Sequence, residues 1–139
     1  MNTLAESALK AVAATSHMTV KAAQERERIA SILKDDRSPV TIADIAVQVA
    51  ITAILRADGA PNCDRIVGEE SSDSLTGEHS DHMQNEVMNL VSSSLRAAGA
   101  ENAIPKNQTE LIELLNAGGL DPQIEKRKSF WCLDPIDGT

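Results

Sequence analysis

Aromatic residues are almost missing from this 139-residue chain, which has no tyrosine, one phenylalanine and one tryptophan. The two aromatic residues, Phe130 and Trp131, are neighbours. Most of a folded core must therefore be packed by Ala, Leu, Ile and Val, as in many helical layers. The aromatic pair is predicted to lie on a buried strand, with one side chain on each face because strand side chains alternate.

Basic residues are also few, because 13 Lys and Arg stand against 21 Asp and Glu, for a formal net charge of −8. Binding to a nucleic-acid backbone needs clustered Lys and Arg, so nucleic acid is not an expected partner. No run of 18 or more apolar residues is present, so we expect no transmembrane helix and no membrane partner. No exposed apolar stripe stands out, so the sequence leaves the oligomeric state open.

Cysteine is limited to Cys63 and Cys132, without C-x-x-C spacing. We expect reduced thiols inside a cell rather than a disulfide. Residues 1–30 include acidic side chains and no apolar signal core, so this segment is interpreted as a helix and not as a targeting peptide. A cytoplasmic location is expected, with organellar targeting of a longer precursor left open.

Apolar periodicity and turn residues predict an order of elements. They are one long or two short helices over 4–33 with a break near 15–17, a helix over 41–57, a strand over 65–67, a surface loop over 71–80, a helix over 81–95, a short helix over 109–116 and a strand over 129–133. Thr41 and Asp44 are spaced like a capping box at the start of the second helix. The expected class is α+β, with two helices followed by antiparallel strands that flank a helical insertion.

Carboxylate side chains are concentrated at the ends of these elements. Asp36 precedes a helix, Glu69 and Glu70 follow one strand, and Asp134 and Asp137 follow another. Two carboxylates about 4 Å apart repel by roughly 4 kcal/mol at an effective dielectric near 20, so a cluster of them requires a cation. Oxygen ligands without His or Cys suit Mg²⁺. The predicted cofactor is therefore Mg²⁺.

The last six residues, D-P-I-D-G-T over 134–139, are informative as chemistry. Pro135 fixes the backbone between the two acids, so that both carboxylates and the Ile136 carbonyl can face one point. Gly138 lets a phosphate approach the main chain. The amides of Gly138 and Thr139 would form an anion site at the start of a following helix, which indicates that residues 1–139 are part of a domain.

Thr139 also carries a hydroxyl that could orient a water for attack, provided that a carboxylate accepts a proton. Asp44 is the candidate acceptor. Capping of its own helix is the alternative role for Asp44, and the two roles are compatible.

Three segments resemble the N-terminal portion of the inositol monophosphatase superfamily: K-D-D-R-S-P-V-T at 34–41 followed by Asp44, G-E-E-S at 68–71, and W-C-L-D-P-I-D-G-T at 131–139. The resemblance implies a layered α/β/α sugar-phosphatase-type fold and a metal-dependent phosphatase. It also implies the following roles: metal binding by Glu69, Asp134, the Ile136 carbonyl and Asp137; a place near an additional metal or its waters for Asp36; phosphate binding by Gly138 and Thr139; and activation of the attacking water by Thr139 with Asp44.

Within the superfamily, the 65 positions between Glu69 and Asp134 and the S-P-V-T after Asp36 resemble the 3′(2′),5′-bisphosphate nucleotidases. That resemblance implies hydrolysis of a small phosphorylated nucleotide, adenosine 3′,5′-bisphosphate (PAP), to AMP and phosphate. It extends to PAPS as a further substrate, inhibition by Li⁺ and a role in sulfur metabolism. An inositol polyphosphate 1-phosphatase or inositol monophosphatase is the alternative.

The resemblance also implies that a further metal-binding Asp and the base and ribose contacts lie beyond Thr139. We therefore expect residues 1–139 alone to be weakly active or inactive. An inactive truncated fragment, acting at most as an interaction module, is the alternative from outside the enzymes.

Overall fold

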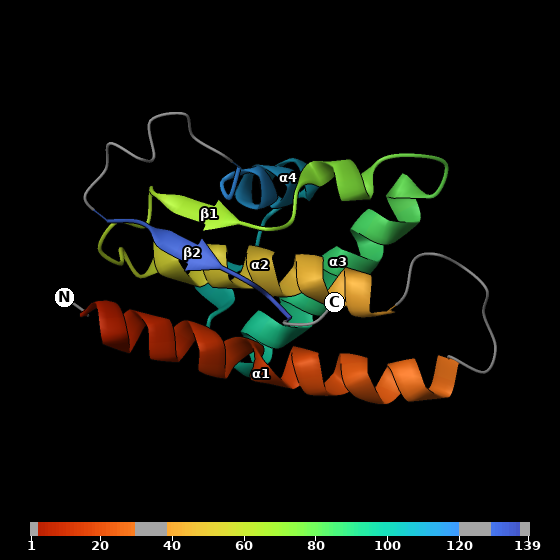
Figure 1. Ribbon diagram of the computed structural model, residues 1–139, viewed down its shortest axis with the longest axis horizontal. Coiled ribbons are helices and arrows are strands. Elements are labelled where there is room, and N and C mark those ends of the chain that lie inside the picture. The colour runs from red at the N-terminus through yellow and green to blue at the C-terminus, as the bar shows by residue number, and fades with distance from the viewer. Residues whose placement is uncertain (1–2, 30–38, 120–128, 137–139) are drawn as a thin grey trace.

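The computed structural model describes residues 3–29, 39–119 and 129–136 (Figure 1). Along these ranges the elements are the α-helices α1 (Leu4–Ile29), α2 (Pro39–Ala57), α3 (Ser80–Ala97) and α4 (Gln108–Asn116), the 3₁₀ helices η1 (Ser72–Leu75) and η2 (Glu101–Ala103), and the strands β1 (Ile66–Gly68) and β2 (Trp131–Leu133). The mixed helix and strand class predicted from the sequence is confirmed.

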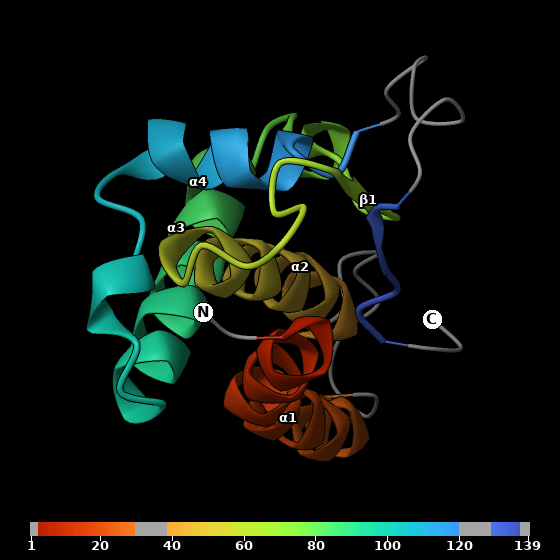
Figure 2. The ribbon, with the colours of Figure 1, turned by 90° about the vertical axis from the view of Figure 1, so that its left-hand side faces the viewer.

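Helix α2 is the centre of the packing. Every residue from 43 to 50 is buried, and α2 contacts α1, α3, α4 and η2. Viewed end-on in Figure 2, α2 lies between α1 and α4, with α3 on one side and the strands on the other. Burial of one Leu, Ile or Val side chain contributes about 1.5–3 kcal/mol, so most of the stabilisation is gathered around this helix.

Helix α1 is one continuous helix, which settles the choice between one and two helices over this segment. The expected break near residues 15–17 is absent. The Thr15 hydroxyl donates a hydrogen bond to the Ala11 carbonyl at 3.0 Å, so this buried polar group is satisfied within the helix. Figure 1 shows α1 running antiparallel to α2.

The other helix ends follow known capping chemistry. Helix α2 begins at Pro39, where the fixed φ of proline suits the first helical position, so the predicted start at Thr41 is two residues late and Asp44 lies inside the helix. Gly59 ends this helix with a φ of 61°, a conformation that favours glycine. The Asn107 side chain caps α4 by accepting a hydrogen bond from the Glu110 amide at 2.9 Å.

Strands β1 and β2 pair in parallel, with Ile66 opposite Trp131 and Gly68 opposite Leu133. The predicted antiparallel arrangement is wrong. The reason is the connection between the strands, which includes α3 and α4 and is long enough to return the chain to the starting end of the sheet, as a parallel crossover requires. Figure 1 shows both arrows pointing the same way.

The aromatic pair is divided by its environment. Trp131 packs against the core, and its indole N–H donates a hydrogen bond to the Pro61 carbonyl at 2.8 Å. Phe130 is 46% exposed, so the predicted burial of both rings is wrong for Phe130. It precedes the first residue of β2 and so lies outside the paired strand residues. Cys63 and Cys132 are free thiols, as expected.

None of the described helices is both long and apolar enough to cross a membrane.

Candidate active site at the ends of the two strands

The parallel register places two of the predicted metal ligands at the same edge of the sheet. Gly68 and Leu133 are partners at the last position of each strand. Glu69 and Asp134 are the next residues, and both are exposed. The carboxyl ends of neighbouring parallel strands are where such folds gather their ligands. The backbone therefore brings Glu69 and Asp134 to the same edge of the sheet, although these residues are 65 positions apart in the sequence.

Hydrogen bonds from every second backbone amide hold the chain from the end of β1 to Ser72. The Gly68 amide donates to the Gly118 carbonyl at 2.8 Å, the Glu70 amide to the Gln48 side chain at 2.9 Å, and the Ser72 amide to the Asn116 side chain at 3.3 Å. Glu69, between the first two of these bonds, is exposed. Because extended chains direct successive side chains to opposite sides, these bonds leave the Glu69 carboxylate on the solvent side.

Asp44 approaches this edge from α2. Its side chain is only 4% exposed. Asp44 lies one helical turn before Gln48, so the two side chains are on the same face of the helix. Since Gln48 bonds to the backbone of Glu70, that face is directed at the segment after β1. The proposed proton acceptor therefore lies beside the acidic strand end.

Negative charge accumulates where these elements meet. Burial raises the pKa of the Glu70 carboxyl above its ordinary value, and the nearby charges of Asp44 and Glu69 raise it further. Glu70 is half-buried. The carboxyl groups of Asp44, Glu69 and Glu70 therefore lie close enough to interact electrostatically.

The donors at this edge fit Mg²⁺ in kind. Glu69 and Asp134 supply carboxylate oxygens, Ile136 supplies a carbonyl oxygen two residues further on, and hard divalent cations prefer such oxygen ligands. Within the described residues, no three His, Cys, Asp or Glu side chains already lie close enough to hold a metal. The predicted site residues Asp36, Asp137, Gly138 and Thr139 lie outside the described residues, so the complete ligand set stays a prediction.

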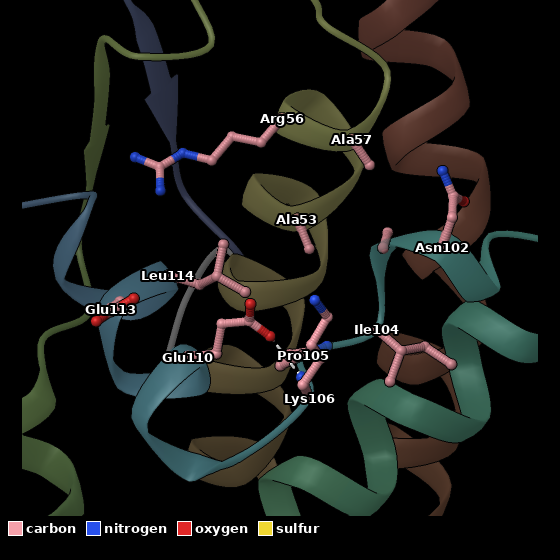
Figure 3. A pocket seen from close by; sticks show the side chains of 11 residues that line it. Ala53, Arg56, Ala57, Asn102, Ile104, Pro105, Lys106, Glu110, Glu113 and Leu114 are labelled. Atoms are coloured by element: carbon pink, nitrogen blue, oxygen red, sulfur yellow. Dashed lines mark hydrogen bonds between the residues drawn. The ribbon is translucent and has the colours of Figure 1, made fainter.

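A separate cavity of about 370 Å³ lies near the C-terminal end of α2 (Figure 3). Arg56 and Ala53 of α2 line it together with residues of α4 and the segment before it. The backbone amide of Lys106 donates to the Glu110 carboxylate there at 2.5 Å. Of the predicted site residues that the structure describes, none lines this cavity, so it is distinct from the acidic strand ends.

Gln48 is the residue at this site that sequence reasoning missed. It is a lone amide within the apolar run from Ile45 to Ile51, and it is completely buried. Buried polar groups are hydrogen-bonded in folded proteins. An isolated glutamine in such a run was therefore a readable signal of a specific partner.

Comparison with curated proteins gives consistent relatives. The chain is 33% identical over 138 residues to a 3′(2′),5′-bisphosphate nucleotidase of Schizosaccharomyces pombe, a match that covers 95% of this chain and 37% of that protein. A 3′(2′),5′-bisphosphate nucleotidase of Emericella nidulans is also 33% identical over 138 residues, covering 93% of this chain and 36% of the relative. The chain is a relative of the 3′(2′),5′-bisphosphate nucleotidases. This confirms the family resemblance inferred from the motifs.

The match extends to plants, because the 3′,5′-bisphosphate nucleotidase 2 of Arabidopsis thaliana is 29% identical over 106 residues, covering 76% of this chain and 30% of that protein. The chain thus spans about a third of the length of the bisphosphate nucleotidases that it matches. No family model matches the sequence. No solved structure matches it either.

Proposed function

We propose that this chain belongs to a Mg²⁺-dependent phosphomonoesterase that hydrolyses adenosine 3′,5′-bisphosphate (PAP) to AMP and phosphate. The main observation behind the proposal is the parallel register of β1 and β2, which places Glu69 and Asp134 at the same edge of the sheet. The names of the relatives support the choice of substrate class. PAPS, which differs in the group on the 5′-phosphate, is proposed as a second substrate.

The chain's own residues would divide the work. Glu69, Asp134, the Ile136 carbonyl and Asp137 would hold Mg²⁺, with Asp36 near a further ion or its waters. Bound Mg²⁺ would neutralise phosphate oxygens and lower the pKa of a coordinated water. Bound Mg²⁺ would also offset the electrostatic repulsion among the carboxylates of Asp44, Glu69 and Glu70.

The proposed reaction is an in-line displacement by water. The Thr139 hydroxyl orients the water, and the buried Asp44 carboxylate takes up its proton. The water oxygen bonds to the 3′-phosphorus and the bond from phosphorus to the ribose 3′-oxygen breaks. The leaving 3′-oxygen takes a proton from solvent and departs as an alcohol, and Asp44 releases the proton that it accepted to solvent. The main-chain amides of Gly138 and Thr139 would bind the phosphate oxygens.

The test is phosphate release from PAP by the complete protein that carries this chain, with Mg²⁺ and with a chelator. We expect Asp134→Asn to lower kcat by about 100-fold or more, as when preorganised electrostatic groups are removed from an active site. The matched control is Asp64→Asn, because the Asp64 side chain is 74% exposed in the loop before β1. This control should retain the parental rate.

Parental turnover by Asp134→Asn would refute the proposed metal site. Inositol 1,4-bisphosphate is the substrate control, since a clear preference for it over PAP would assign the protein to the inositol phosphatases instead. Inhibition by Li⁺ should accompany activity that depends on Mg²⁺. A complete protein that releases phosphate from neither substrate would favour a non-enzymatic role.

Residues 1–139 alone are proposed to be weakly active or inactive. The chain spans about a third of its relatives, and the described residues alone do not complete a metal site. PAP turnover by residues 1–139 at the rate of the complete protein would contradict this.

A further inference from the structure

Gln48 uses both ends of its side-chain amide in hydrogen bonds. Its nitrogen donates to the Glu70 carbonyl at 2.8 Å, and its oxygen accepts from the Glu70 amide at 2.9 Å. The nitrogen also lies 3.4 Å from the Leu115 carbonyl at the end of α4. One completely buried amide thus joins α2, the segment after β1, and α4.

Two glycines make room for this amide. A Cβ atom on Gly68 would lie 2.5 Å from the Gln48 side-chain carbon and oxygen, and a Cβ on Gly118 would lie 2.9 Å from its nitrogen. Contacts under about 3 Å require atoms to move. The Gln48 side chain is therefore packed tightly between two backbone segments, which leaves it few other rotamers.

We infer that Gln48 is a positioning residue that fixes the two acids Glu69 and Glu70 relative to Asp44. The paired bonds hold the backbone of Glu70 in one orientation, as a neighbouring strand would. Glu69, the residue before it, is then held with its exposed side chain at the sheet edge shared with Asp134. Asp44 is on the same helix face as Gln48, so a single helix sets both the acidic pair and the proposed proton acceptor.

The alternative is that Gln48 only stabilises the fold. A purely apolar residue of similar size would then serve as well, because replacing a buried polar group by a packed apolar one is often near neutral. Among the residues that the structure describes, the Gln48 amide bonds only to the backbone of a segment that carries two acids and of the adjacent helix end. Specific orientation of that segment is what a two-ended amide provides and an apolar side chain does not.

The experiment compares two replacements that separate these roles. Gln48→Met keeps the length and removes all three hydrogen bonds of the amide. Gln48→Glu keeps an acceptor for the Glu70 amide but places an oxygen against the Glu70 carbonyl. The matched control is Thr52→Val one turn later on α2, since Thr52 is also completely buried and its hydroxyl has no hydrogen-bond partner within the described residues.

The first measurement is hydrogen exchange of individual amides by NMR, without metal. We expect Gln48→Met to speed exchange of the Glu70 amide at least tenfold. The Trp131 amide, which donates to the Arg65 carbonyl at 2.8 Å at the start of the strand pair, should stay within about twofold of the parent. Equal acceleration of both amides, or unchanged exchange at Glu70, would overturn the positioning role.

The second measurement rests on the proposed function and titrates Mg²⁺ against the melting temperature of the complete protein. Both Gln48 variants should raise the half-saturating Mg²⁺ concentration about tenfold or more, the range seen when groups that orient metal ligands are removed. Thr52→Val should leave it unchanged. Parental Mg²⁺ dependence in Gln48→Met would overturn the inference.

The two proposals fail in different ways. A parent protein that neither responds to Mg²⁺ nor hydrolyses PAP would defeat the proposed function, and the exchange rates of the Glu70 amide would still decide whether Gln48 fixes this segment. A responsive parent with unaffected Gln48 variants would defeat the inference about Gln48 alone.

Discussion

The helices around α2 and the pair of strands are built on different principles. In the helical region, long apolar side chains such as Ile45, Val87 and Leu95 are completely buried. The strands are three residues each, and in β2 no residue is fully buried. Stability is thus concentrated in the helices. The acidic residues follow two short strands, and the segment after β1 is tied to α2 by the hydrogen bonds of Gln48.

The largest expected loss in the free energy of unfolding comes from truncating a core residue of the helical region. Leu95 in α3 is completely buried, so Leu95→Ala is expected to lower the free energy of unfolding by about 2–5 kcal/mol. The matched control is Leu9→Ala, because Leu9 in α1 is 71% exposed, and its cost should stay within about 0.5 kcal/mol. Denaturation followed by circular dichroism measures both, and equal costs would contradict the described packing of these helices.

A smaller effect is expected in the strand pair. Trp131→Phe removes the indole N–H that donates to the Pro61 carbonyl at 2.8 Å, and one such bond contributes about 1 kcal/mol. We expect a loss of about 1–2 kcal/mol in the free energy of unfolding, including lost contacts. Phe130→Leu, at a 46% exposed position, should change stability by less than about 0.5 kcal/mol. A larger cost at Phe130 than at Trp131 would reverse the assignment of their environments.

The smallest effect is electrostatic and depends on pH. Burial, Asp44 and Glu69 raise the pKa of Glu70 above its ordinary value of 4.5. The folded state then holds this proton more tightly than the unfolded state, so stability falls as pH rises from about 4.5 through the raised pKa. Without Mg²⁺, Glu70→Gln should therefore be more stable than the parent at pH 7, with the difference vanishing below pH 4.5.

Thermal melting across this pH range in the presence of a chelator provides the measurement. Glu78→Gln is the matched control, since Glu78 is exposed in the loop before α3 and should melt like the parent. A Glu70→Gln variant that is less stable than the parent at pH 7 would show that the carboxylate is favoured where it lies.

Local signals in the sequence were sufficient for most elements. Apolar spacing predicted the four helices, and Gly59 and Gly99, both with positive φ, predicted where two of them end. The short stretch 65–67, with Ile66 and Val67 before a glycine and an acidic pair, predicted the first strand. These features depend on neighbours within a few positions, which is the range over which helix and turn preferences act.

Strand direction and the exposure of Phe130 depended on distant contacts instead. Nothing within residues 65–67 or 129–133 specifies a parallel pairing, because the direction follows from the path of the intervening helices. The role of Gln48 was missed for a related reason, since its partner Glu70 is 22 positions away. The site residues Asp36, Asp137, Gly138 and Thr139 fall outside the described residues and stay predictions.

The long separation between the paired strands also orders events during folding. Helices α1 and α2 contact each other along adjacent stretches of chain, and such local contacts form early, whereas closing a loop of more than 60 residues is entropically costly and slow. We therefore expect the β1–β2 pairing to form after the intervening helices have packed onto α2. Synthesis from the N-terminus favours the same order of events. Glu69 and Asp134 would then stay apart in the nascent chain until the helices around α2 have folded.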